Sequence, residues 1–312
     1  MKLSIITINY NNAEGLRKTL ASVASQTYRD IEHIIVDGAS TDGSLDVIKE
    51  YENQLNITHS TIHLLWSSEP DNGIYNAMNK GIEIALGKRV VNAFNRSELV
   101  EDKNIGIQRA TGDYVWILNS GDCVATPDSV ERMLSVVGNN DMPLLLGNIV
   151  RVLPGNKTMY SPLPIKPSKD LIPRPIETSM LTFYTGTIPQ DAAFVKRELF
   201  DMYGVFDEKL KIVSDWKLYL NMIALGGVVP MYVNIDVVLF DMTGISNTNM
   251  ECLKQEKRNY LEEILPASVL KDYDAYAFPI RQYQRLKKYH LWGLVHFIER
   301  VLFKLEKWRI LR

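Results

Sequence analysis

The chain has 312 residues, of which 46% are hydrophobic, and its formal net charge at pH 7 is −2. This length and composition allow a large buried core, in one large domain or in one domain with an appendage. The near-zero charge argues against nucleic acid as a partner. The two cysteines, Cys123 and Cys252, have no metal-type spacing, and no apolar run reaches the about 18 residues of a membrane-spanning helix. With no signal peptide recognisable after Met1, we expect a cytoplasmic protein.

The first third of the chain alternates between strand-like and helix-like patterns. Leu3–Ile8 is a run of mostly β-branched residues and predicts a buried strand, and the following Asn11–Asn12 pair suits the cap of a helix over Leu16–Val23. The same reasoning predicts two more strands with a helix between them, at Ile31–Val36, Thr61–Trp66 and Ser44–Tyr51. This alternation is typical of βαβ units and therefore of a parallel sheet.

The expected elements become less regular further along the chain. Residues 88–111 look like extra material between a helix over Ile74–Leu86 and a strand over Tyr114–Leu118. Leu153–Thr178 is rich in Pro and Lys without periodicity, and it predicts a long loop. The other predicted elements are a strand at Leu144–Val152, helices at Arg197–Met202 and Ser214–Ala224, closing strands at Val228–Val233 and Val237–Phe240, and helices from Asn249 onward.

Polar turns follow three of the predicted strands, at Thr7–Asn11, Asp37–Asp42 and Asn119–Asp122. In a parallel sheet these turns lie at one edge, where open α/β sheets bind ligands. The first two turns offer amide and carboxylate groups for a base and a ribose. Asp122 offers a hard oxygen ligand that suits Mg²⁺ or Mn²⁺ beside substrate phosphates. Asp215, which begins a later helix, is a candidate general base.

Each of these acidic residues also has a purely structural interpretation. Asp37 and Asp42 suit turn formation and helix capping, and Asp215 suits the positive end of a helix dipole. Their order along a βαβ chain favours the ligand-binding interpretation over the structural one.

Six segments together form a recognisable pattern: Leu3–Asn11, Val36–Ser44, Ser68–Gly81, Ala110–Asp122, Gly204–Glu208 and Ser214–Trp216. Ser68–Gly81 is especially specific. On these segments the chain resembles the inverting GT-A glycosyltransferases of family 2, of the kind that act in bacterial polysaccharide synthesis. The resemblance implies an α/β fold with a mostly parallel sheet flanked by helices. We expect that domain to span residues 1–245, with the insertion at about 88–111, and a helical, amphipathic and basic extension to span 246–312.

The resemblance also implies roles for individual residues. In that family the segments after the first strands bind the nucleotide sugar, which here assigns this role to Thr7, Asn9, Tyr10, Asp37, Asp71, Asn119 and Ser120. The last carboxylate of the Asp-x-Asp-like motif is Asp122, which would hold Mg²⁺ or Mn²⁺, and Asp215 would be the catalytic base. The implied reaction transfers a sugar with inversion from a nucleotide-diphospho-sugar, expected to be UDP-linked, to a hydroxyl of a glycan or lipid-linked acceptor.

Three departures from the family pattern bear on these roles. Many relatives have two adjacent acids after the second strand, whereas Asp37 is followed by Gly38. The metal motif, Asn119–Asp122, carries fewer acids than usual, so we expect weaker metal binding without the nucleotide. Where relatives often have His-Gln, this chain has Gln190–Asp191, so acceptor recognition is expected to differ.

Three other interpretations compete with this one. A nucleotidyltransferase needs an early Gly-rich, basic loop for a triphosphate, and Thr7–Asn12 contains neither glycine nor a basic residue. An NAD-dependent dehydrogenase needs a Gly-x-Gly-x-x-Gly motif after the first strand, and that motif is absent. A non-catalytic module derived from such an enzyme is supported only by the thinned metal motif, because Asp122 and Asp215 both remain.

The C-terminal segment has its own charge pattern. From Arg281 to Arg312, nine Lys and Arg residues stand against Glu299 and Glu306, a net charge of +7. Apolar and aromatic residues recur there at intervals of about three and four, as on one face of a helix. A basic, aromatic, amphipathic helix is typical of a membrane interface, so 281–312 predicts peripheral contact with the anionic inner face of the plasma membrane. The alternative is a helix packed on the catalytic domain or on a second subunit of a homo-oligomer.

Overall fold

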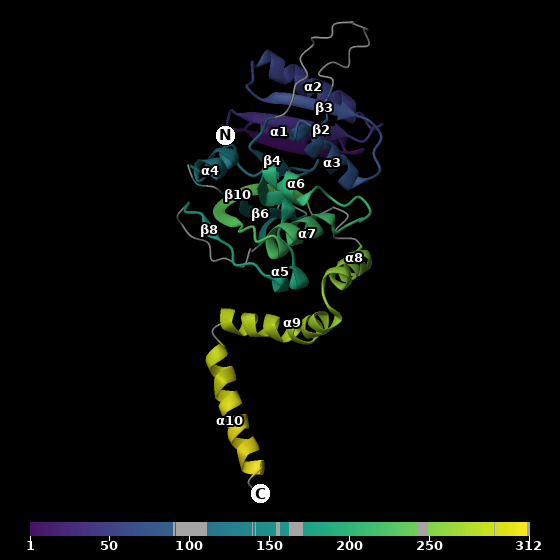
Figure 1. The fold of residues 1–312 in the computed structure, drawn as a ribbon. Helices are drawn as coiled ribbons and strands as arrows, with labels where there is room; N and C mark the ends of the chain where they lie inside the picture. The colour runs from purple at the N-terminus through teal and green to yellow at the C-terminus, as the bar shows by residue number, and fades with distance from the viewer. Residues whose placement is uncertain are drawn as a thin grey trace. The chain divides into compact units, whose positions relative to one another are not determined.

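The computed structural model describes residues 1–89, 91, 111–138, 140, 142–153, 157–161, 171–241, 249–289 and 291–310 (Figure 1). The chain divides into two compact units. The first comprises Met1–Phe183 and Thr187–Lys257, and the second comprises Tyr184–Gly186 and Arg258–Arg312. The division falls inside helix α8 (Met250–Ile264). The assignment of residues 1–245 and 246–312 to separate domains stays a prediction.

A ten-stranded sheet forms the centre of the first unit, as far as its residues are described. The strand order is β3-β2-β1-β4-β9-β6-β10-β5, with β7 beside β6 and β8 beside β10. Strands β1 to β4 are parallel, and β9 lies antiparallel between β4 and β6. The strands are β1 (Leu3–Asn9), β2 (Ile31–Asp37), β3 (His63–Ser68), β4 (Tyr114–Ile117), β5 (Cys123–Val124), β6 (Leu144–Leu153), β7 (Lys157–Ser161), β8 (Arg174–Pro175), β9 (Ala193–Lys196) and β10 (Met231–Asp241).

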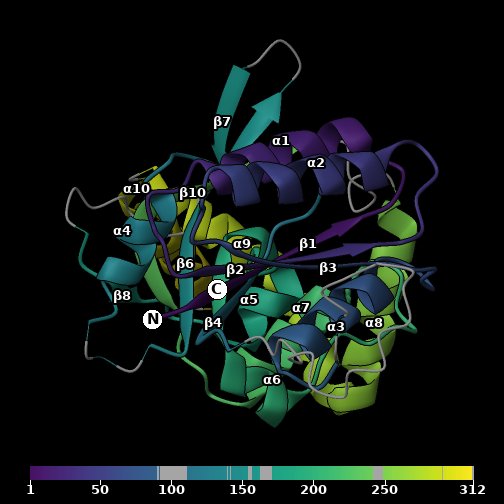
Figure 2. The ribbon, with the colours of Figure 1, turned by 90° about the horizontal axis from the view of Figure 1, so that it is seen from above.

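Helices cover both faces of the parallel strands. Figure 2 shows α1 and α2 together on one face of β1 to β3 and α3 on the other. The helices of the first unit are α1 (Ala13–Ala24), α2 (Ser44–Ile57), α3 (Ile74–Ala85), α4 (Ser129–Ser135), α5 (Met180–Thr185, its last two residues in the second unit), α6 (Arg197–Tyr203), α7 (Ser214–Tyr219), a π-helical turn (Leu220–Leu225) and the first part of α8. Every residue of β1 and β2 is buried because helices cover both faces, and this burial explains their continuous apolar sequence.

The expected cap of the first helix is confirmed. The Asn12 side chain caps α1 by accepting a hydrogen bond from the Gly15 N–H at 3.1 Å. Gly81 lets α3 lie close to β1, since a Cβ at that position would be 2.4 Å from the Ile6 side chain. The predicted insertion at 88–111 falls almost wholly outside the described residues.

Two expectations about the second half of the sheet are wrong. Leu153–Thr178 is not one long loop, because Lys157–Ser161 forms β7 and pairs antiparallel with β6. The two closing strands form the single strand β10, which contains register shifts between Tyr232 and Val238. Such shifts interrupt the alternation of side chains, and this interruption makes one irregular strand read as two short ones.

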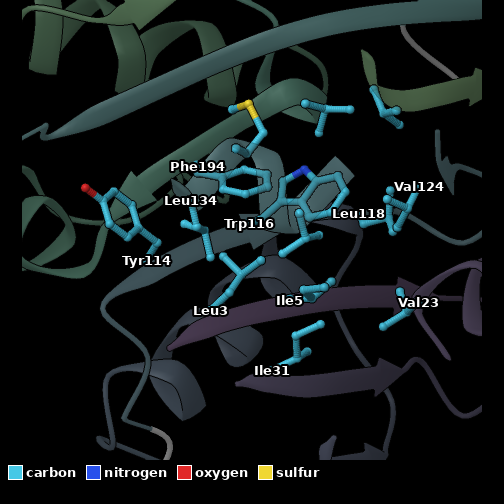
Figure 3. Close-up of a cluster of buried hydrophobic side chains, with 14 of the residues drawn as sticks. Leu3, Ile5, Val23, Ile31, Tyr114, Trp116, Leu118, Val124, Leu134 and Phe194 are labelled. Carbon is cyan, nitrogen blue, oxygen red and sulfur yellow. The ribbon is translucent and has the colours of Figure 1, made fainter. Parts of the chain in front are cut away.

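The core between the sheet and α1, α2 and α4 supports the functional edge of the sheet (Figure 3). Trp116 of β4 and Phe194 of β9 lie at its centre, with ring centroids 4.9 Å apart. The Trp116 Nε1–H donates to the Asp191 carbonyl at 2.7 Å. The core therefore fixes the backbone at Asp191, just before β9.

The second unit consists of helices. They are the last two residues of α5, the end of α8, then α9 (Ala267–Lys288) and α10 (Trp292–Ile310). The amphipathic segment predicted from residue 281 is therefore divided between two helices. Arg258 pairs with Asp274 at 2.8 Å, and the Tyr184 and Tyr273 rings stack with centroids 5.2 Å apart. Among the helices described, none is long and apolar enough to cross a membrane.

Candidate active site

A cavity of about 920 Å³ opens in the first unit at the carboxyl ends of β1 and β4. Seven of the nine site residues predicted from the sequence line it: Asn9, Tyr10, Asp71, Asn119, Ser120, Asp122 and Asp215. Thr7 and Asp37 are fully buried behind it. The parallel strands bring these residues together because their polar ends lie at one edge of the sheet.

Asp37 and Thr7 are buried and do not line the cavity themselves. The Asp37 carboxylate accepts hydrogen bonds from Asn9 Nδ2 at 2.8 Å, Ser40 Oγ at 2.6 Å and Ser68 Oγ at 2.7 Å. Thr7 Oγ1 lies 3.0 Å from His33 Nε2, and burial lowers the pKa of His33 to about 3, so this imidazole stays neutral. Asp37 acts on the cavity through Asn9, which lines it, whereas the partner of Thr7 is His33, which does not.

Buried polar atoms without a protein partner gather at this cavity. Of the six such side-chain atoms among the described residues, three belong to cavity-lining residues: Asn9 Oδ1, Asn119 Oδ1 and Gln190 Nε2. A buried acceptor or donor without a partner costs about 1–3 kcal/mol. Their clustering therefore indicates a polar ligand that supplies the missing partners.

Gly38 stands after β2 where many relatives have a second acid, and the Asp71 carboxylate fills the space beside it. A Cβ added at Gly38 would lie 2.5 Å from Asp71 Oδ2 and 3.0 Å from the Tyr10 ring. Asp71 is held in place because its Oδ1 accepts the Gly73 N–H at 2.9 Å. Gly38 thus admits a carboxylate from the loop before α3, and the exposed ring of Tyr10 lies beside it.

Asp122 lines the cavity, and only 4% of its surface is exposed. Its Oδ1 accepts the backbone N–H of Asp241 at 2.8 Å. Antiparallel pairing of β5 with β10, with Cys123 opposite Leu239, brings Asp241 to this position. Burial raises the pKa of Asp122, and the charges of Asp191 and Asp241 raise it further.

Asp191 and Asp241 are cavity residues that the sequence did not assign to the site. Asn119 Nδ2 donates to Asp191 Oδ1 at 3.4 Å, and burial and the charge of Asp215 raise the pKa of Asp191. The departure from His-Gln at Gln190–Asp191 was the available signal for Asp191. No sequence signal pointed to Asp241, because only the pairing of β10 with β5 brings this residue to the cavity.

Asp215 is the second residue of α7 and lines the same cavity. Burial raises its pKa, while the Trp216 backbone N–H and the Lys257 charge oppose that rise. The Tyr75 hydroxyl lies 3.3 Å from Asp215 Oδ1. A buried carboxylate with a raised pKa is a stronger proton acceptor than an exposed one, provided that it is ionised.

The charge of the cavity suits a divalent cation. Five lining residues are aspartates, and Lys211 is the one basic residue among the described residues of the lining. The described part of the chain contains no group of three or more His, Cys, Asp or Glu side chains arranged to hold a metal. Asp122 still fits Mg²⁺ or Mn²⁺, because such ions are commonly held by one or two carboxylates and completed by substrate phosphates. A cation there would also offset the repulsion around Asp122.

A sequence model described as glycosyl transferase family 2 matches residues 4–94 and 89–204. These segments contain β1 to β4, β9 and most of the carboxylates at the cavity. The match extends over more than half of the chain. The chain therefore belongs to glycosyl transferase family 2 and is a glycosyltransferase.

Curated relatives are consistent with this assignment. An uncharacterised glycosyltransferase of Mycobacterium tuberculosis is 28% identical over 249 residues, which cover 78% of this chain and 77% of the relative. A PGL/p-HBAD biosynthesis glycosyltransferase of Mycobacterium bovis is 24% identical over 247 residues, which cover 78% of this chain and 79% of the relative.

Solved structures share the fold. TarS 1-349 of S. aureus, solved in complex with UDP-GlcNAc, aligns with a TM-score of 0.57 at 17% identity over 86% of this chain and 69% of that chain. A Pyrobaculum calidifontis mannosyltransferase, solved with GDP-Man and Mn²⁺, aligns with a TM-score of 0.52 at 15% identity over 92% of this chain and 84% of that chain. The chain spans 41% of the longer TarS chain. These likenesses show a GT-A fold, as the sequence predicted.

Proposed function

We propose that this glycosyltransferase transfers a sugar from a UDP-linked donor, with inversion and with a divalent metal, to a hydroxyl of a glycan or lipid-linked acceptor in bacterial surface polysaccharide synthesis. The observation that carries the proposal is that Asn9, Asp122 and Asp215 line one cavity. These residues are far apart in the sequence, and transfer from a nucleotide sugar needs their three roles at one place. A non-catalytic binding module would have no use for a buried carboxylate at Asp215.

The nucleotide would bind beside β1 and β2. Asn9 Oδ1 is buried without a protein partner, and Asp37 holds the other atom of this amide, Nδ2. The imide N–H of a uracil ring would satisfy that acceptor. Tyr10 would stack on the base, and Asp71 would accept a hydrogen bond from a ribose hydroxyl. TarS, which shares the fold, has been solved with UDP and with UDP-GlcNAc.

Asp122 would hold Mg²⁺ or Mn²⁺ against the diphosphate, with Asn119 and Ser120 beside it. When bound there, the ion would supply Lewis-acid stabilisation of the charge on the departing diphosphate. Asp122 can take this role only in its ionised form, and a cation favours that form against the repulsion from Asp191 and Asp241. The mannosyltransferase with the same fold has been solved with Mn²⁺.

Asp215 would accept the proton of the acceptor hydroxyl as that oxygen attacks the anomeric carbon. Asp215 comes from α7 and Asp122 from the turn after β4. The base and the metal ligand beside the leaving group would therefore come from different elements around the cavity. A base behind the attacking oxygen and a diphosphate leaving from the other face lead to inversion in one step. Gln190 and Asp191, which replace the usual His-Gln pair, would then contact the acceptor.

Helix α10 supports a location at a membrane surface. Several of its described large apolar side chains are exposed, including Phe297 and Phe303, which are each 65% exposed. Arg300 and Lys304 lie among them. Exposed aromatic and basic residues on one helix suit the interface of an anionic membrane, where a lipid-linked acceptor would be held. We propose a peripheral position at the inner face of the plasma membrane, and a homo-oligomer formed through this helix is the alternative.

Thermal unfolding against a panel of nucleotide sugars, with and without Mn²⁺, tests the donor assignment. A ligand that binds only the native protein raises the melting temperature. We expect a UDP-sugar to raise it, and to raise it further with Mn²⁺. Asn9→Ala should abolish the rise, whereas Asn53→Ala, at an exposed position of α2, should not. A panel in which no nucleotide sugar changes the melting temperature would contradict the proposal.

A further inference from the structure

Helix α8 holds the turn that leads into α7. Glu256 accepts three consecutive backbone N–H groups: Oε1 accepts that of Lys211 at 2.7 Å, and Oε2 accepts those of Ile212 at 3.0 Å and Val213 at 3.3 Å. Hydrogen bonds to an ionised carboxylate are stronger than those between neutral groups. Ile212 and Val213 are buried, so Glu256 satisfies backbone donors that would otherwise lack a partner.

The same turn is held from its other side by α3. The Tyr75 hydroxyl donates to the Ile212 carbonyl at 2.5 Å and accepts the Ser214 N–H at 3.2 Å. This hydroxyl also lies 3.3 Å from Asp215 Oδ1. The position of Asp215 therefore depends on a turn whose N–H groups are bound by α8 and whose carbonyl is bound by α3.

The residue after Glu256 brings a positive charge to the same place. Lys257 Nζ lies 4.9 Å from the ring centroid of Trp216, the residue next to Asp215. Trp216 is 1% exposed, and its Nε1–H donates to the Phe183 carbonyl at 2.9 Å, so this ring is a fixed platform for the lysine.

Lys257 is the cation that offsets the burial of Asp215. Burial raises the pKa of that carboxyl, and the Trp216 backbone N–H and the charge of Lys257 oppose the rise. The charge of Asp215 in turn raises the pKa of Asp191, Tyr75 and Tyr219. The ionisable groups that face Asp215 are thus Tyr75 from α3, Asp191 from the turn before β9, Tyr219 from α7 and Lys257 from α8, and Lys211 lines the same cavity.

We propose that Glu256 and Lys257 are positioning residues for sugar transfer: Glu256 fixes the turn that presents Asp215, and Lys257 keeps Asp215 in its proton-accepting form. The proposal rests on the proposed function of Asp215 as the base. It makes the first part of α8 a component of the active site. A protein that ended at residue 245, the boundary expected from the sequence, would lack both residues.

Lys257→Met tests the charge, and Lys254→Met, at an exposed position of the same helix, is its matched control. Sugar transfer is measured against pH at saturating donor and Mn²⁺. Removing the cation favours protonated Asp215, so the acid limb of the profile should move to higher pH. We expect the ratio of turnover at pH 6 to turnover at pH 8 to fall about threefold or more. Lys257→Arg should restore the wild-type profile, and Lys254→Met should keep it.

Glu256→Gln tests whether the Glu256 carboxylate fixes the turn before α7. This variant keeps the size of the side chain and loses the charge that accepts three N–H groups. We expect turnover to fall about tenfold at every pH, with the KM for the donor unchanged, because misplacing a reacting group lowers the rate without weakening a distant contact. Thermal unfolding with and without UDP shows whether the variant remains folded, and Lys257→Met tests the proposal if it does not.

Asp215→Asn distinguishes failure of the proposed base role from failure of the α8 proposal. If this variant transfers sugar at the wild-type rate, the proposed base role fails, whatever α8 does. If Asp215→Asn is inactive while Lys257→Met keeps the wild-type pH profile, or folded Glu256→Gln keeps wild-type turnover, the α8 proposal is overturned and the base role stands. An inactive Asp215→Asn together with a shifted Lys257→Met profile and a slow Glu256→Gln supports both.

Discussion

Replacement of Asp37 should destabilise the fold as well as weaken nucleotide binding. Its place at the end of a predicted strand suggests a rim residue whose loss the fold tolerates. The structure shows instead a carboxylate with no exposed surface, bound by Asn9 Nδ2, Ser68 Oγ, and both Oγ and N–H of Ser40. It therefore ties together the ends of three strands and the turn after β2.

The expected loss of folding stability follows from these four hydrogen bonds. Each bond to a charged group contributes about 1.5–3 kcal/mol, but bonds to one carboxylate are not additive, and Asn9 Nδ2 keeps Ser40 Oγ at 3.2 Å as a second acceptor. We expect Asp37→Ala to lower the free energy of unfolding by about 2–4 kcal/mol. For a unit of this size, that corresponds to a melting temperature lower by roughly 4–16 °C.

Thermal unfolding of the ligand-free protein measures the loss of stability, and calorimetric titration with UDP measures the loss of nucleotide affinity. Asp37→Asn keeps one acceptor and should destabilise less. Asp46→Ala, on the exposed surface of α2, should change the melting temperature by about 2 °C at most. UDP affinity should fall by about 1–3 kcal/mol in Asp37→Ala, because Asn9 loses its orienting partner. A melting temperature for Asp37→Ala equal to that of the wild type would show that this network does not hold the edge of the sheet.

Two further predictions concern pH and the C-terminal helix. Because the pKa of Asp122 rises on folding from 3.8 to about 8, the folded protein binds this proton more tightly than the unfolded chain, and metal-free stability falls as pH rises between these values. Asp122→Asn should therefore melt above the wild type at about pH 8 and much closer to it at about pH 5, and a constant difference would contradict the repulsion inferred around Asp122. The full chain should sediment with anionic liposomes at low salt and be released as ionic strength rises, whereas a chain ending at Tyr289, or one with Phe297→Ser and Phe303→Ser, should stay in solution with nucleotide binding intact. Equal partitioning of all three proteins would leave α10 as a packing or dimerisation element.

Local patterns were sufficient for the first half of the sheet. The strand ends predicted at Ile8 and Val36 lie within one residue of the ends of β1 and β2, because each apolar run stops at a polar turn. Parallel pairing then puts those turns at one edge whatever the details of the helices. Asn9 and Asp122, which the sequence predicted as site residues, line one cavity for this reason, and their roles stay predictions.

The remaining cavity residues depend on long-range pairing that no local pattern encodes. Asp241 lies beside Asp122 only because β10 pairs antiparallel with β5. Asp191 lies there because β9 enters the sheet between β4 and β6 and Trp116 binds its carbonyl. Glu256 belongs to a helix that looked like part of a separate extension. Each of these contacts joins segments whose separation in the sequence gives no periodic signal.

The most direct test of the central claim compares Asp122→Ala with Asp215→Asn in one sugar-transfer assay with UDP-sugar and Mn²⁺. We expect Asp122→Ala to lose metal-dependent nucleotide binding and turnover together, because this carboxylate would hold the ion against the diphosphate. We expect Asp215→Asn to bind the donor as the wild type does and to lose transfer, because only proton removal from the acceptor is lost. Transfer by Asp215→Asn at a rate near that of the wild type would contradict the assignment of Asp215 as the base.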